Sequence, residues 1–223
     1  MGSAIDLLRK RVKREGQVPI SLDIDYAVIF SSLQGNLPIN NQAKGTIGDI
    51  PVELQFEHSI VPNTMGSFPI NTLLTGMIGD DPVRAKMTYK IVFSTIAGNI
   101  PVNTGISWKH EGKEYFLTMP YTLVPAAARG GGAGSGGSTG RKAKRVFTPK
   151  FSRGKMIQVD EVISGSGGPS QEAGRPICKG IFGMIDDIEV NLQFDYTYYI
   201  NTSSGRNPIN IRAKGYLAPA SPQ

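Results

Sequence analysis

The sequence predicts an all-β fold, an antiparallel meander of repeated β-hairpin units closed as a sandwich or a barrel, with a short N-terminal helix. Apolar and polar residues alternate over four long segments, and Gly-containing turns separate these segments. The stretch VIFSSLQGNLPIN at 28–40 also returns as IVFSTIAGNIPVN at 91–103. The word Pro-Ile-Asn or Pro-Val-Asn occurs at 38, 69 and 101, so the repeat is about 31 residues long. Such a repeat of one hairpin turn indicates one sheet built from similar units.

Residues 3–14 predict a short amphipathic helix. Ser3 is placed to cap it, with Asp6 three residues further on. Its apolar face consists of Ile5, Leu8 and Val12. Basic residues cover the remaining surface, so we expect residues 1–18 to form a basic N-terminal arm.

Period-two alternation predicts four long strands with one buried face each, at 22–30, 52–60, 83–93 and 190–200. In the second of these, His58 falls on the apolar face. A Gly-containing turn then leads to a second strand that opens with Pro-Ile-Asn or Pro-Val-Asn, at Pro38, Pro69, Pro101 and Pro208. Pro lacks a backbone donor and suits a strand start, and the Gly-Asp pairs that follow suit turns.

The repeats define the domain organisation. Residues 19–125 form the repeated hairpin body, and residues 175–223 supply a final repeat that completes the same domain. Between them, residues 126–174 are a Gly-rich and basic insertion.

Basic residues are concentrated in two segments of a chain whose net charge is +6. The rest of the chain is net acidic. We expect the two segments to contact a neighbouring subunit or nucleic acid. The candidate contact residues are Arg9, Lys10, Arg11, Lys13, Arg14, Arg141, Lys142, Lys144, Arg145, Phe147, Lys150, Phe151, Arg153 and Lys155.

The segment 141–155 leaves two interpretations open. Its cations can neutralise phosphates while Phe147 and Phe151 stack on bases. Alternatively, the segment docks on an acidic face of a neighbouring copy, since the body of the chain is acidic. Either interpretation makes the segment an arm.

No catalytic signature is recognisable, and we expect neither an enzyme nor a cofactor. Nucleophilic catalysis would rest on Cys178 with His58 or His110, and no local motif supports that. The pairs Asp80-Asp81 and Asp186-Asp187 fit turns better than a calcium site, because no further ligand series follows. The Gly-rich run before Arg141 lacks the Lys-Ser/Thr end of a phosphate-binding loop.

The basic helix, the β-only body and the Gly-rich basic insertion together resemble viral or phage structural proteins. The closing stretch IEVNLQFDYTYYI and the tail Ala220-Ser221-Pro222-Gln223 resemble the last strand and tail of jelly-roll coat proteins. The word GNIPVNTG resembles the sandwich of late-embryogenesis proteins. The tandem repeat departs from a jelly roll and favours a meander sheet, barrel or tube subunit.

These observations predict a self-assembling structural protein of a virion or phage tail, assembled in the host cytoplasm. Its subunits would join through β-sheet edges and through the basic and Gly-rich arms. Its partners would be copies of itself and other structural subunits, with nucleic acid as a further possibility and no membrane. A nucleic-acid-binding β domain that uses residues 141–155 is the alternative, and in that case the location is the cytoplasm.

Overall fold

The computed structural model describes residues 4–31, 35–63, 66–94, 98–125, 151–152, 155–156, 174–201 and 203–220. The chain divides into two compact units, Met1–Ala128 with Ala173–Gln223, and Arg129–Glu172. In the second unit the described residues form two short paired strands, β9 (Phe151–Ser152) and β10 (Lys155–Met156). All other elements belong to the first unit.

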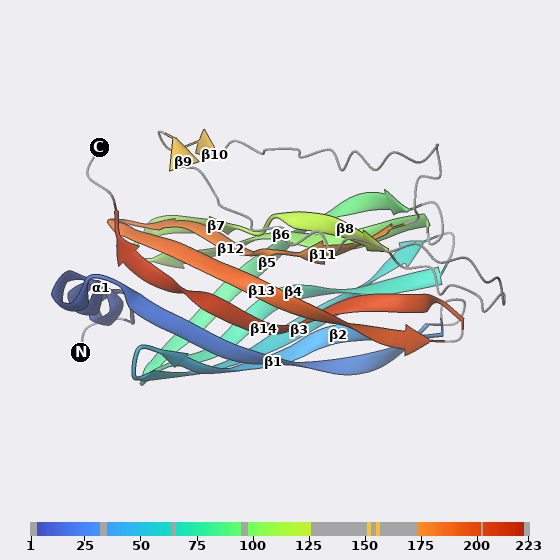
Figure 1. The fold of residues 1–223 in the computed structure, drawn as a ribbon, viewed down its shortest axis with the longest axis horizontal. Coiled ribbons are helices and arrows are strands. Elements are labelled where there is room, and N and C mark those ends of the chain that lie inside the picture. The colour runs from blue at the N-terminus through green and yellow to red at the C-terminus, as the bar shows by residue number, and fades with distance from the viewer. Residues whose placement is uncertain are drawn as a thin grey trace, which may run out of the picture. The chain divides into compact units, whose positions relative to one another are not determined.

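The first unit consists of helix α1 (Ala4–Glu15) and a closed antiparallel barrel (Figure 1). The strands around the barrel follow the order β1-β14-β13-β12-β7-β6-β5-β4-β3-β2. Their bounds are β1 Val18–Ser31, β2 Gly35–Ile47, β3 Ile50–Asn63, β4 Gly66–Ile78, β5 Asp81–Ser94, β6 Gly98–His110, β7 Lys113–Thr118, β12 Gly180–Ile185, β13 Ile188–Asn201 and β14 Gly205–Pro219. Strands β8 (Tyr121–Pro125) and β11 (Gly174–Cys178) form a separate pair. The predicted antiparallel meander with a short helix is confirmed, and the barrel is the closure that forms.

Five long hairpins build this barrel. In chain order, the first three are β1–β2, β3–β4 and β5–β6. In the fourth, β7 and β8 form one arm and β11 and β12 form the other. The fifth is β13–β14. Four of the hairpins carry a β-bulge, where one extra residue of the second strand lies opposite no partner: Asn41, Thr72, Thr104 and Ile211. A bulge of this kind bends the strand and shifts its register.

The bulges divide the barrel into two halves. On the side of α1, which we call the base half, neighbouring hairpins pair through their backbones. Beyond the bulges, the described backbone pairs lie only within each hairpin. We call this part the hairpin half; its described residues are 26–31, 35–40, 58–63, 66–71, 89–94, 98–103, 121–125, 174–178, 196–201 and 203–210.

The prediction that each first strand keeps one buried face is wrong in the hairpin half. In β1, Leu22 and Ile24 line the interior, but Phe30 on the same face is exposed. In β2 the extra bulge residue shifts the pairing with β1 by one position. Leu37 and Ile39 therefore lie on the other face of the hairpin from Phe30, and on that face they are buried. The side chains left outside include Tyr26, Val28, Phe30, His58, Ile60, Tyr89, Ile91, Leu123, Tyr196 and Ile200.

Helix α1 lies at the base of the barrel (Figure 1), where Leu8 and Val12 join the core. The helix ends at Glu15, and the next residue, Gly16, donates its N–H to the carbonyl of Val12 (2.8 Å) with a φ of 76° that glycine tolerates. The predicted Gly-Asp turns are confirmed at this end, because β2 and β3 are joined by the two residues 48–49 and β4 and β5 by 79–80.

Candidate functional site

A closed circuit of hydrogen bonds crosses the barrel interior at the level of the bulges. One residue from each hairpin takes part, and we call the set the amide ring: Asn40, Asn71, Asn103, Cys178 and Asn210. Each side chain donates to the backbone carbonyl of the next member. The donor–acceptor distances are 2.8 Å for Asn40 to Asn210, 2.9 Å for Asn71 to Asn40, 2.8 Å for Asn103 to Asn71, 3.3 Å for Cys178 Sγ to Asn103 and 3.0 Å for Asn210 to Cys178.

The amide ring lies where backbone pairing between hairpins stops. A buried carbonyl without a donor is costly, and the Asn side chains supply the donors that a neighbouring strand would otherwise supply. Asn71, Asn103 and Asn210 are themselves almost fully buried. The ring therefore joins the five hairpins at the point where each becomes a separate ribbon.

Sequence reasoning missed this ring. Its signal is the third residue of each Pro-Ile/Val-Asn word, and these words predict no more than the start of a strand. The fourth member was hidden because Pro176-Ile177-Cys178 carries Cys where the other copies carry Asn. The pairing of Cys178 with Tyr121 matches that of Asn40 with Tyr26, which identifies the fourth copy.

Cys178 is a ring member in a setting that opposes thiolate chemistry. Burial raises the pKa of its thiol to about 12, so the thiol is protonated near neutral pH and donates to the carbonyl of Asn103. His58 lies exposed in the hairpin half, and His110 ends β6 at the opposite, base end of the barrel. The structure thus does not bring the two histidines to Cys178.

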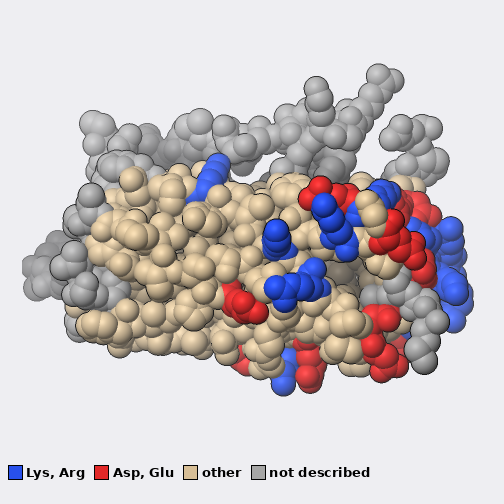
Figure 2. All heavy atoms as spheres, turned by 180° about the vertical axis from the view of Figure 1, so that it is seen from behind, with Lys and Arg blue, Asp and Glu red and all other residues tan. Residues whose placement is uncertain are grey.

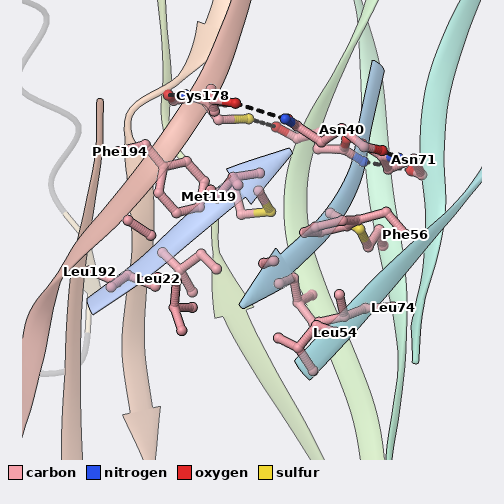
Figure 3. Close-up of a pocket in the computed structure, with 18 residues that line it drawn as sticks. Leu22, Asn40, Leu54, Phe56, Asn71, Leu74, Met119, Cys178, Leu192 and Phe194 are labelled. Carbon is pink, nitrogen blue, oxygen red and sulfur yellow. Dashed lines mark hydrogen bonds between the residues drawn. The ribbon is translucent and has the colours of Figure 1, made fainter. Parts of the chain in front are cut away.

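An apolar chamber of about 80 Å³ lies on the base side of the amide ring. Figure 3 shows Cys178, Asn40 and Asn71 along one end of this space and apolar side chains pointing into it. The apolar lining consists of Leu22, Ile24, Ala43, Leu54, Phe56, Leu74, Met87, Ile106, Met119, Ile181, Leu192, Phe194 and Ala213. These residues come from all five hairpins.

The N-terminal basic residues make ion pairs within the chain. Arg9 bonds to Asp6, Asp186 and Asp187, and Arg11 bonds to Glu15 and Asp49. Lys13 lies 3.4 Å from Asp187 and Arg14 lies 2.6 Å from Glu15. Lys10 is exposed. These contacts fasten α1 to the turns at the base of the barrel.

The other predicted contact residues fall mostly outside the described part of the chain. Phe151 lies in β9 and Lys155 in β10. The residues outside the described ranges are Arg141, Lys142, Lys144, Arg145, Phe147, Lys150 and Arg153. Their contact with a subunit or with nucleic acid stays a prediction.

In the part of the chain that the structure describes, the outer surface of the hairpin half carries few charges. The described residues of the hairpin half include no Asp or Glu, its exposed cations among them are Lys90 and Arg206, and Arg175 is buried. Figure 2 shows the same division on one face, where acidic and basic side chains gather over the half that carries α1. We call the exposed apolar residues of this surface the apolar collar: Tyr26, Val28, Phe30, Ile60, Tyr89, Ile91, Leu123, Tyr196 and Ile200.

Within the described ranges, no three His, Cys, Asp or Glu side chains are grouped so as to hold a metal ion. The helix in the described part of the chain is too short and too polar to cross a membrane. No protein-family model, no curated protein and no solved structure matches the chain.

Proposed function

We propose that this chain is a non-enzymatic structural subunit that assembles with copies of itself through the apolar collar, in a virion or a phage tail. The observation that carries the proposal is the apolar outer surface of the hairpin half, whose described residues include no acidic side chain and few cations. The virion setting rests on the resemblance described for the sequence.

Exposed apolar area of this kind favours association. Phe30 is 76% exposed and Ile200 is 72% exposed, at equivalent positions of the first and fifth hairpins. Removing apolar surface from water contributes about 25 cal/mol per Å². Contiguous apolar patches on a folded domain mark interaction sites, and the cores of protein interfaces are poor in charge and rich in aromatic residues.

A second copy is the partner that this surface fits best. A surface with few charges meets its own copy with little like-charge repulsion, and a two-fold interface brings the same patch of both copies together. The cation of Lys90 lies over the ring of Tyr121 (4.5 Å to the centroid), and Arg206 lies 5.9 Å from the ring of Tyr198. These contacts occupy the exposed cations with aromatic rings of the same chain.

The contact proposed here uses side chains. In the closed barrel each long strand is paired on both sides in the base half, which leaves no edge there for a neighbouring strand. Strand addition would be confined to the hairpin half. The arms 1–18 and 126–174 stay candidates for additional contacts.

The first test is the molar mass of the purified protein by light scattering over a range of concentrations. We expect a discrete mass that is a multiple of 24.0 kDa. The double variant Phe30→Lys/Ile200→Lys should shift the mass toward the monomer. The matched control is Met77→Lys, which places a Lys on an exposed apolar position in the base half, opposite Glu53.

Two further results separate this proposal from its competitors. Deletion of residues 128–155 should leave the number of subunits unchanged if the apolar collar is the main contact. It should reduce the number of subunits if the arm is the main contact. A monomer at every concentration would overturn self-assembly. Salt-sensitive binding of a generic nucleic acid by that monomer would favour the alternative function.

A further inference from the structure

We infer that the chamber beneath the amide ring is a binding site for a small, uncharged, apolar molecule. This site does not depend on self-assembly, because the chamber lies inside one chain and the apolar collar lies outside it. The inference rests on the size of the chamber, the origin of the space and the chemistry of its lining.

The space arises from two short side chains. Ala43 and Ala213 lie on either side of β1, opposite Ile24 and Leu22. At the equivalent positions of the second, third and fourth hairpins the chain has Leu74, Ile106 and Ile181. Protein interiors normally fill such space with side chains, so the two alanines leave one side of the interior open.

The lining favours an apolar occupant. Phe56 and Phe194 supply ring faces and edges, and Met87 and Met119 supply flexible, polarisable side chains that adapt to a guest. The 18 lining residues include no Asp, Glu, Lys, Arg or His. A charged guest would lose its hydration and find no counter-ion among these residues.

The amide ring closes one end of the chamber, and every ring side chain directs a donor hydrogen to a backbone carbonyl of the ring. Asn40 and Asn71 each direct the amide nitrogen to a backbone carbonyl of the ring. Cys178 directs its thiol to the carbonyl of Asn103. Cavities with a mainly apolar lining stay dry and take up guests such as xenon, as an engineered cavity of about 150 Å³ does. A chamber of about 80 Å³ is smaller and selects a smaller guest.

The test uses the full chain and xenon or cyclopropane as the probe. We expect saturable shifts of the Met87 and Met119 methyl resonances and a higher Tm under xenon than under helium. Methylammonium, a small cation, should cause neither change. A crystal of the full chain under xenon pressure should show the xenon atom between Phe56, Met119 and Phe194.

Variants that fill the chamber supply the control. Ala43→Val and Ala213→Val should abolish the methyl shifts and the xenon-dependent rise in Tm, and Ala218→Val, outside the lining, should retain both. If the two variants that fill the chamber do not fold, the position of xenon in the wild-type crystal tests the inference by itself. No saturable shift, xenon bound elsewhere, or ordered water filling the chamber would overturn the inference. None of these outcomes bears on the mass measurement that tests self-assembly.

Discussion

Asn71 donates its side-chain amide to the backbone carbonyl of Asn40, 2.9 Å away, at the level where the hairpins that carry them stop pairing through their backbones. The two residues are the third members of successive Pro-Ile-Asn words, so a sequence repeat becomes a repeated hydrogen bond. Five such donations close a circuit around the barrel, and each hairpin depends on its neighbour for one donor.

Asn71→Ala should therefore weaken the barrel. Removal of the donor takes this hydrogen bond from the part-buried carbonyl of Asn40, and an unsatisfied buried polar group costs about 1–3 kcal/mol. Urea unfolding followed by circular dichroism measures the loss. Asn41→Ala changes the exposed bulge residue beside the ring and should cost less than about 0.5 kcal/mol. Equal losses of unfolding free energy for the two variants would show that the hydrogen bond donated by Asn71 does not stabilise the barrel.

Cys178→Asn should restore the repeat in the fourth hairpin. The new amide is placed to donate to the carbonyl of Asn103, as the thiol does at 3.3 Å, and an amide is the stronger donor. We expect stability within about 1 kcal/mol of the wild type, and a loss of about 1–3 kcal/mol for Cys178→Ala, which removes the donor. Chemical denaturation of both variants measures this. An Asn variant less stable than the Ala variant would contradict the assigned role.

The Cys178 thiol should make stability depend on alkaline pH. Burial raises its folded-state pKa to about 12, above the ordinary value of about 8.5. The folded state therefore holds the proton more tightly, and its contribution is complete below pH 8.5 and lost as pH rises toward 12. The slope is at most about 1.4 kcal/mol per pH unit. The difference between wild type and Cys178→Ser, measured by urea unfolding at pH 7 to 10.5, isolates this group; a difference independent of pH would refute it.

Leu8→Ala should loosen α1 from the base of the barrel. Leu8 is 6% exposed and packs in the main core, so its truncation should cost about 2–4 kcal/mol. The adjacent Leu7 is 43% exposed, and Leu7→Ala should be nearly neutral. Thermal unfolding compares the two variants. If both behave as wild type, the helix does not contribute to the stability of the barrel.

The meander, the turns and the helix could be predicted from the sequence because each depends on local signals. Glycine and aspartate mark the turns, and Leu8 and Val12 mark one helix face. Closure into a barrel depends on how β1 meets β14 at the far end of the chain, and no local pattern encodes that pairing. Repeats of one hairpin are equally compatible with an open sheet.

The candidate site could not be predicted because it depends on a single extra residue in each of four hairpins. The register shift beside Asn41 means that the buried residues of β2 lie on one face of the hairpin before the bulge and on the other face after it. The alternation of apolar and polar residues along β1 continues unchanged. Tyr26 and Phe30 therefore look like core residues in the sequence and form a surface in the structure. An inserted residue carries no compositional signal, and the face that it buries is visible only in the pairing.

Gly45→Ala should be among the most damaging small substitutions in the barrel. A Cβ at Gly45 would lie 2.0 Å from the carbonyl oxygen of Ser21 on the neighbouring strand, so the backbones of β1 and β2 would have to separate. Gly105 offers a matched comparison, because its nearest clash is with the ring of Phe116, which is exposed and can rotate away.

We expect Gly45→Ala to cost about 3 kcal/mol or more, and Gly105→Ala to cost less, because a side chain yields more readily than a strand. Urea unfolding of the two variants, with the chain at the same concentration, gives the comparison. A larger loss for Gly105→Ala would mean that β1 and β2 are not held as closely as the structure places them, and the register on which the amide ring depends would then need to be revised.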